Sequence, residues 1–579
     1  MPVRTFRTPL IAAFFCAAVS AGCAEDQTGS KTDYTRCKFS TTAIASIQGS
    51  RPASAMIDQQ VTVQGVVTLI EAGHGIYLEE PGSDIDERTS NAIFVQSGKL
   101  SESVKQGSWI SAQGKVAELR KGRNSLTALT DVSDIIQCSS GQDLPLTTVE
   151  LPLGGLERES LEGMRIQPTG TLTVTDTYQL GHGKFSLAGN GFQFVATEIL
   201  APGSEAEKYQ RINRNHTLPA SFAKNSAHTD LLVSGLSVTD LSGVLTHDKR
   251  SLRVSVQSMS ADSPSALTPP VQAGADELRV VGMNLLNFFN GDGKGGGFPT
   301  PRGAKTTIEY DHQRSRLRAA IHKLNPHVLA VMELENDGFG GLSAAADFIA
   351  LVEQATGASW QASRPAGDDT GGDKITVGIF YRDDLLEVTG PARTLTGPEF
   401  KKSRQPMAQA FRQRNNDEKL LIVTNHLKSK GSCPDSGVDA NQKDGQGCWN
   451  PIRTASAEKM TAWVKSLAAT SQTDNTIILG DMNAYRQEDP INAIRAAGFI
   501  ELMDNTEGTE YSYIYYGQAG TLDYAFVSEE LLQQVQQAFI WHVNAAFPAK
   551  MELPLPWLRF SDHDPVVIDI RLHQSATSD

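Results

Sequence analysis

The sequence has few cysteines, no excess of positive charge and no second long apolar run. Its 579 residues include six cysteines, and no two of them are spaced as CxxC, so a zinc site is not favoured. Lys and Arg number 52 against 66 Asp and Glu, which gives a formal net charge of -14. A wholly basic surface for holding polyanions is therefore excluded, and any contact with nucleic acid must be local or bridged by metal.

The one long apolar run lies near the N-terminus, at residues 10–21, where it follows two arginines and ends in small residues. This pattern is typical of an export signal, and we predict a signal peptide at residues 1–24. We expect no stable membrane span, because no other stretch approaches transmembrane length. The sequence thus predicts a secreted, extracellular or periplasmic protein of a bacterium. Lipoprotein anchoring at Cys23 is less favoured, since Ser20 stands where a lipobox usually has Leu.

Four cysteines remain beyond the predicted signal region. An even number in an exported chain favours disulfides. Their spacing predicts a bond between Cys37 and Cys138 within one N-terminal domain, and a bond between Cys433 and Cys448 that closes a short loop. Each would contribute about 3 kcal/mol on loop-closure grounds.

The length predicts two to four domains, and the first two are rich in β-structure. Residues 31–144 show short strands between glycine-containing turns, as expected for an all-β domain like the oligonucleotide/oligosaccharide-binding (OB) fold. Aromatic residues for base stacking are sparse there, so a structural or targeting role is as well supported as nucleic-acid binding.

Residues 145–257 form a β-rich middle domain without a catalytic constellation. We expect barrel-like strands at 170–177, 191–200, 231–238 and 252–256. The Ser-, Ala- and Pro-rich segment 258–276 is predicted to be a linker.

Residues 277–573 alternate apolar strands with amphipathic helices, the pattern of an α/β domain. Polar side chains stand at the ends of its strands, where ligand-binding loops collect. They are Asn284, Asn287, Glu333, Glu335, Asp373, Asn425, His426, Asp481, Asn483, Asp523, Asp562 and His563. Hard oxygen ligands without cysteine select Mg²⁺ or Mn²⁺, and paired histidines supply proton transfer. The set therefore predicts phosphodiester hydrolysis by activated water.

The strings GMNLLNFF, MELEND, NHLKSKG, GDMNAY, LDYAF and SDHDP occur in this order between residues 277 and 573. Together they resemble the endonuclease/exonuclease/phosphatase superfamily, the fold of pancreatic deoxyribonuclease. The β-rich N-terminal half and the inserted loops are similar, more closely, to bacterial extracellular nucleases of the ExeM type. The resemblance implies a multidomain chain that ends in a DNase I-like four-layer α/β sandwich.

The same resemblance implies roles for individual residues. Glu333 would be the principal ligand of Mg²⁺ or Mn²⁺, with Asn284 and Asp562 near the same cation and Ca²⁺ as an additional candidate. Asp481 would position or deprotonate the attacking water, and Asn483 would donate to the phosphate.

Two histidines would stabilise the phosphoryl group and assist the leaving oxygen. Asp523 would orient His563, and Asp373 would orient His426, although the loop GDDTGGDK also offers Asp369 for this second role. Residues beside the motifs would contact the substrate phosphates: Asn287, Arg302, Arg404 and Lys428.

We therefore expect a monomeric, secreted, metal-dependent endonuclease acting on extracellular DNA, with RNA as a further substrate. One alternative is a phosphodiesterase of the same superfamily that acts on lipid or small phosphodiesters. A second is a cell-surface binding protein without catalytic activity.

Overall fold

The computed structural model describes residues 37, 40–82, 87–98, 100–119, 125–222, 231–247, 252–264, 268–503 and 510–573. The predicted signal peptide and Cys23 lie outside these residues. Within the described part, no helix is both long enough and apolar enough to cross a membrane.

Five strands at the N-terminal end close into a barrel of order β1-β2-β3-β5-β4, in which β3 and β5 run parallel. A short helix, α1 (Ile44–Gln48), packs its isoleucines into the apolar centre of this barrel. The strands are β1 (Gln60–Glu71), β2 (Gly75–Glu79), β3 (Ala92–Gln96), β4 (Trp109–Glu118) and β5 (Thr127–Ser139). The predicted disulfide between Cys37 and Cys138 ties the preceding segment to β5.

The middle segment forms a seven-stranded sheet of order β12-β10-β9-β8-β11-β7-β6. An additional β11–β12 pairing closes five of its strands into a ring, again with one parallel pair, β10 and β12. The strands are β6 (Thr147–Val149), β7 (Arg165–Pro168), β8 (Leu172–Asp176), β9 (Lys184–Ala188), β10 (Thr217–Phe222), β11 (Ser237–His247) and β12 (Leu252–Ala261). The helices are α2 (Gly155–Ser160), η2 (Leu180–His182), α3 (Ala196–Ile199) and α4 (Ser204–His216).

Two of the strand predictions for the middle segment are wrong. Residues 191–200 contain helix α3 instead, and residues 231–236 form a turn before β11 begins. Both segments are apolar because they pack between domains, and Val233 reaches the core of the C-terminal domain. The linker also begins later in the structure than predicted, because β12 continues to Ala261.

The C-terminal half contains two mixed sheets that pack face to face. One has the order β15-β16-β14-β13-β27-β26 and the other the order β17-β19-β20-β21-β25-β22, with β18 paired to β19. The first comprises β13 (Leu278–Phe288), β14 (Val328–Glu335), β15 (Trp360–Ala362), β16 (Ile375–Arg382), β26 (Val535–Ile540) and β27 (Val566–Ile570). The second comprises β17 (Leu386–Val388), β18 (Arg393–Thr394), β19 (Met407–Gln413), β20 (Lys419–His426), β21 (Thr476–Asp481), β22 (Ile500–Glu501) and β25 (Asp523–Val527).

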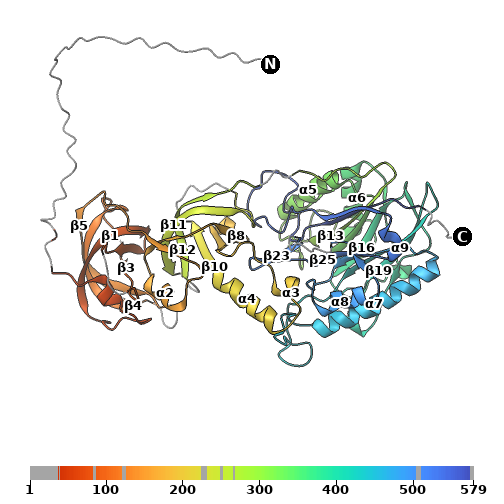
Figure 1. The fold of residues 1–579 in the computed structure, drawn as a ribbon. Helices are drawn as coiled ribbons and strands as arrows, with labels where there is room; N and C mark the ends of the chain where they lie inside the picture. Colours follow the sequence, from red (N-terminus) through yellow and green to blue (C-terminus); the bar gives the residue numbers. More distant parts are fainter. Residues whose placement is uncertain are drawn as a thin grey trace, which may run out of the picture.

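Helices cover the outer face of each sheet, giving four layers (Figure 1). An apolar cluster fills the space between the sheets. The predicted amphipathic face of α5, which includes Leu317 and Ile321, is buried against the first sheet, and each such side chain contributes roughly 1.5–3 kcal/mol. The remaining elements are α5 (Thr307–Leu324), α6 (Ala344–Thr356), α7 (Asn450–Ser471), α8 (Asp489–Ala496), α9 (Glu529–Leu532), η3 (Ala366–Asp368), η4 (Pro398–Phe400), β23 (Tyr513–Tyr515) and β24 (Gln518–Gly520).

The middle segment lies between the barrel and the C-terminal half (Figure 1). Backbone hydrogen bonds join it to β24, because Val195 donates to Ala519 O and Ala519 donates to Gln193 O, both at 2.9 Å. The hairpin of β23 and β24 is thereby fixed to the middle segment. The second predicted disulfide, between Cys433 and Cys448, closes the loop that precedes α7. Both disulfides are consistent with an oxidising compartment.

Candidate active site

Sheet register brings three of the predicted residues side by side. Strands β20 and β21 are parallel neighbours, and His426 pairs in register with Asp481 at their carboxyl ends. Strand β25 runs antiparallel to β21, so its first residue, Asp523, stands opposite Asp481. Apolar runs of similar length thus end at one edge of the sheet, and their polar tips meet there.

The loop before β27 adds His563 to this group. Its Nδ1 lies 2.7 Å from Asp523 Oδ2, and this carboxylate oxygen also accepts a hydrogen bond of 2.7 Å from Ser512 Oγ. On the other side, Asp481 Oδ2 lies 3.3 Å from His426 Nε2 and 4.0 Å from His563 Nε2. One buried carboxylate therefore faces two imidazoles.

The surroundings move the two histidine pKa values apart. Burial lowers the pKa of His426 well below its ordinary value, and Arg404 and His563 lower it further. Burial also opposes protonation of His563, but Asp523, through its charge and hydrogen bond, and Asp481 raise the pKa of His563 well above its ordinary value. Burial raises the pKa of Asp481 to about 7. The group therefore holds a neutral imidazole, a carboxyl that titrates near neutral pH and an imidazolium.

Backbone irregularities in β13 and β14 aim further polar groups at the same edge. Register shifts interrupt the pairing after Asn284 and between Val331 and Leu334. Asn287 and Glu333 have φ values of 52° and 62°, in the left-handed region that residues other than glycine rarely adopt. Such strained positions cluster at functional sites.

Glu333 and Asp562, which were predicted to share a cation, lie close enough to interact. Burial raises the pKa of Glu333, and the Asp562 charge raises it further. Among the described residues, no Lys or Arg forms an ion pair with either carboxylate. Asn284 is buried beside them, and Asn287 Oδ1 is a buried oxygen without a hydrogen-bond partner. Two adjacent carboxylates with free oxygen acceptors fit a hard divalent cation.

A second group could also bind metal, because ligand atoms of Asp481, Asp523 and His563 lie within 4.8 Å of one another. In this group, His563 Nδ1 and Asp523 are already hydrogen-bonded to each other, so one possible ligand atom of each is in use. In the first group, Glu333 Oε2 accepts the Asn287 N–H, but Asn287 Oδ1 is left as a buried acceptor without a partner, which a cation could use.

The predicted pairing of Asp373 with His426 is wrong. His426 Nδ1 has no hydrogen-bond partner, whereas Asp373 lies 3.9 Å from Arg302 Nη1 and 3.8 Å from Arg404 Nη1. The alternative, Asp369, is exposed and accepts the Gly371 N–H. Neither acid of this loop orients the histidine.

Of the four predicted phosphate contacts, Arg404 lies deepest in the site. It is buried, donates to Leu427 O at 2.8 Å, and is close enough to Asp481 and Glu333 to interact with their charges. Burial lowers its pKa to about 10, so it stays charged at neutral pH. Arg302 is exposed, with its Nη1 3.9 Å from Asp373.

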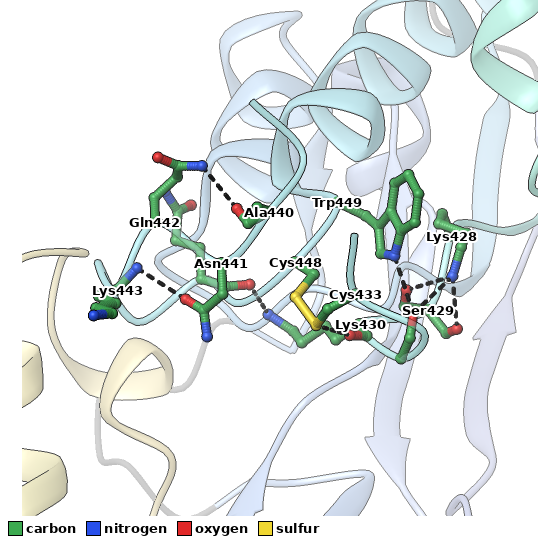
Figure 2. The surroundings of a disulfide bond; sticks show 12 residues. Lys428, Ser429, Lys430, Cys433, Ala440, Asn441, Gln442, Lys443, Cys448 and Trp449 are labelled. Atoms are coloured by element: carbon green, nitrogen blue, oxygen red, sulfur yellow. Dashed lines mark hydrogen bonds between the residues drawn. A yellow bond between two sulfur atoms is a disulfide. The ribbon is translucent and has the colours of Figure 1, made fainter. Parts of the chain in front are cut away.

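The other predicted contacts are held by local hydrogen bonds. Lys428 Nζ donates to the carbonyls of Ser429 and Gly431 and lies 5.1 Å from the Trp449 ring centroid (Figure 2). Asn483 donates its backbone N–H to Asp481 Oδ1, and Asn287 donates its own to Glu333 Oε2, each at 2.9 Å.

Two residues of the site were not predicted. Ser512 donates to the same Asp523 oxygen that His563 contacts, and the Tyr513 ring lies 4.5 Å from the His563 ring. The tyrosine-rich string YSYIYY at residues 511–516 was a visible signal, but alternating aromatics are equally typical of a buried strand.

Comparison with known proteins agrees with this geometry. The model of the Endonuclease/Exonuclease/phosphatase family matches residues 290–563. The C-terminal half of the chain therefore contains a domain that is similar to this family over those residues. No curated protein matches the chain.

Several solved structures are similar to about half of the chain. They include the human Nocturnin catalytic domain with bound sulfate, which is 15% identical, covers 51% of this chain and 95% of its own, and has a TM-score of 0.33. An endonuclease/exonuclease/phosphatase family protein from Bacteroides thetaiotaomicron is 15% identical, with 52% and 98% coverage and a TM-score of 0.36. D. rerio TDP2 in complex with a single-strand DNA product is 14% identical, with 51% and 98% coverage and a TM-score of 0.33.

Proposed function

We propose that the protein is an exported, metal-dependent endonuclease that hydrolyses the phosphodiester bonds of DNA, and also of RNA. The observation that carries this proposal is the Asp481 carboxylate, which lies within 3.3 Å of one imidazole and 4.0 Å of another. General bases with pKa values near the working pH are the most effective ones. Asp481, with a pKa of about 7, suits removal of a proton from the attacking water.

The remaining residues would stabilise charge. His563, held as an imidazolium by Asp523, donates a hydrogen bond to the phosphoryl oxygens or protonates the leaving oxygen. Arg404 supplies a permanent positive charge at the same edge. A Mg²⁺ or Mn²⁺ ion held by Glu333, Asp562 and Asn284, with Ca²⁺ binding in addition, would neutralise charge on the scissile phosphate.

The export, fold and substrate assignments rest on further features. The two disulfides support export, and the 1-2-3-5-4 strand order supports an OB-type barrel in the N-terminal domain. Cationic side chains gather at the site of an acidic protein, including Arg404, Lys428 and Arg302, which favours a polyanionic substrate over a lipid. The same features support the likeness to extracellular nucleases of the ExeM type.

Cleavage assays of the purified protein test the proposal. We expect Mg²⁺ or Mn²⁺ to support internal cleavage of end-labelled DNA and RNA, and EDTA to abolish it. Sphingomyelin vesicles and a small chromogenic phosphodiester serve as parallel substrates. If the lipid is hydrolysed while the DNA stays intact, the nuclease assignment is overturned in favour of a lipid phosphodiesterase.

A further inference from the structure

A groove of about 950 Å³ lies between the middle segment and the C-terminal domain. Helix α4 and the start of β10 form one wall. The other wall comes from the disulfide-closed loop before α7, from Tyr485 and from the β23–β24 hairpin. None of the residues predicted to be catalytic lines this groove.

The walls of the groove are basic. Five of its lining residues are Lys or Arg and one, Glu207, is acidic. Lys430 is committed to Glu488, but Arg211, Arg214 and Lys443 are exposed, and no ion pair holds any of them within the described part of the chain. In a chain with a net charge of -14, such a local excess of positive charge provides a specific place for an anion.

One side of the groove also carries exposed aromatic rings. Tyr515 is 55% exposed and Tyr516 is 81% exposed, which is unusual for adjacent large side chains. Their ring centroids lie 4.5 Å apart, and Tyr515 lies 6.4 Å from Tyr513, which in turn packs against His563 at 4.5 Å. A continuous row of rings thus leads from the catalytic histidine into the groove.

The hairpin that carries these rings is held in place by both domains. Strand β24 exchanges two backbone hydrogen bonds with residues 193 and 195, and Gln210 of α4 donates to Gln518 Oε1 at 2.7 Å. The loop on the same wall is closed by the disulfide, and Gly203, directly before α4, donates to Asp444 O of this loop at 2.8 Å. Figure 2 shows Lys443 on this loop, next to the middle segment. The groove is therefore preformed and needs little reorganisation to bind a ligand.

We propose that this groove binds a single-stranded segment of the polynucleotide substrate that extends from the catalytic site. The proposal rests on the nuclease function proposed above. Basic side chains that follow a phosphate backbone, combined with exposed rings on which bases stack, are the recurring features of single-strand binding. Stacking on Tyr516 requires bases that are not paired, so a duplex is not the preferred ligand of the groove.

Fluorescence anisotropy with 5′-fluorescein-labelled dT12 and dT2, in EDTA to prevent cleavage, tests the proposal. Wild-type protein binds dT12 at least tenfold more tightly than dT2, and the Arg211→Ala/Arg214→Ala double variant loses most of this advantage. The slope of log affinity against log salt falls by roughly 0.7 for each phosphate contact removed. Tyr516→Ala weakens dT12 binding roughly five- to a hundredfold, as loss of one stacked base predicts, whereas Tyr516→Phe keeps it.

Lys208→Ala is the matched control, because Lys208 lies on the same helix outside the groove and pairs with Glu205 at 3.8 Å. Unchanged dT12 affinity in the double variant and in Tyr516→Ala would overturn the proposal, as would an equal loss in Lys208→Ala. Tighter binding of a 12-base-pair duplex than of dT12 would also overturn it.

Plasmid cleavage by the wild-type protein separates the two proposals. If the wild-type protein nicks plasmid but the binding of dT12 does not depend on the groove residues, only the proposal for the groove is overturned. Groove-dependent binding of dT12 without nicking in Mg²⁺ or Mn²⁺ would overturn the nuclease function instead.

Discussion

His426 and His563 face the same carboxylate but are held in opposite protonation states. Arg404 lies near His426 and opposes its protonation, whereas Asp523 contacts His563 and favours it. Groups with pKa values driven apart in this way are suited to opposite roles in proton transfer. The Asp523 carboxylate is thus the residue on which the charge of His563 most depends.

Replacement of Asp523 by Asn keeps a hydrogen-bond acceptor for His563 Nδ1 and removes the negative charge. We expect the pKa of His563 to fall and the DNA cleavage rate to drop roughly 10²- to 10⁴-fold, the range for loss of general acid–base catalysis. Side-chain ¹⁵N NMR and initial cleavage rates measure the two effects. The control Ser512→Ala removes one hydrogen bond to the same carboxylate and should cost much less activity. An unchanged His563 pKa in Asp523→Asn would contradict this account.

His542 gives the fold a pH dependence that is separate from catalysis. Burial opposes its protonation, but hydrogen bonds to Asp564 and Glu510 raise its pKa to about 9. Because this value exceeds the ordinary value of 6.5, the stabilisation is complete below pH 6.5 and is lost as the pH rises through 9. The melting temperature of the wild-type protein should therefore fall more between pH 6.5 and 9.5 than the melting temperature of the His542→Gln variant. Equal changes in the two melting temperatures would show that the bonds of His542 to Asp564 and Glu510 add no pH-dependent stability.

At the residue scale, the sequence predicted contacts that strand register imposes and missed contacts that loops make. Asp481 and Asp523 end or begin apolar strands, so their meeting followed from the pattern. Ser512 lies directly before β23 and outside the apolar strands, so the strand pattern gives it no place in the site. The loop that holds Asp373 contains three acids within six residues, and only tertiary packing decides that Arg302 and Arg404 take one of them.

At the scale of elements, the loop before α7 depends on its disulfide. Residues 427–449 contain no helix or strand, and within this loop Trp449 donates its Nε1–H to Gly431 O at 3.0 Å and its backbone N–H to Asp439 O at 2.8 Å. The Cys433→Ser/Cys448→Ser double variant should lose up to about 3 kcal/mol, the closure entropy of a 15-residue loop. Urea unfolding measures this loss. A variant as stable as the wild type would show that the hydrogen bonds of the loop suffice.

Element prediction succeeded where burial on both faces produced continuous apolar runs, as in β14 and β21. It failed at residues 191–200, whose alternating pattern suited a strand. There, Thr197 donates to Glu488 Oε1 and Glu198 binds Arg486 of the other domain, so contacts between domains select a helix. Local sequence carries no information about partners almost 300 residues away.

At the scale of the whole molecule, the middle segment and the C-terminal domain share a buried ion-pair network. Glu198 accepts from Arg486 Nε and from the Thr521 N–H, and Arg486 also pairs with Glu501. We expect these two parts to unfold in one calorimetric transition.

Glu198→Ala should lower the free energy of unfolding by about 3 kcal/mol, because loss of one partner leaves a buried charge with fewer contacts. The control Glu205→Ala removes an exposed acid of α4 and should cost less than about 1 kcal/mol. Separate transitions for the two parts in the wild-type protein would contradict a single cooperative unit.

We propose that the cluster around Asp481 hydrolyses phosphodiester bonds of DNA. The most direct test is the initial rate at which supercoiled plasmid is nicked in Mg²⁺ by the wild-type protein, by His563→Ala and by the control His542→Ala. We expect rapid nicking by the wild type and by the control, a rate at least about 10²-fold lower in His563→Ala, and no nicking by any of them in EDTA. Folded wild-type protein that leaves the plasmid intact, or His563→Ala that nicks it at the wild-type rate, would contradict the claim.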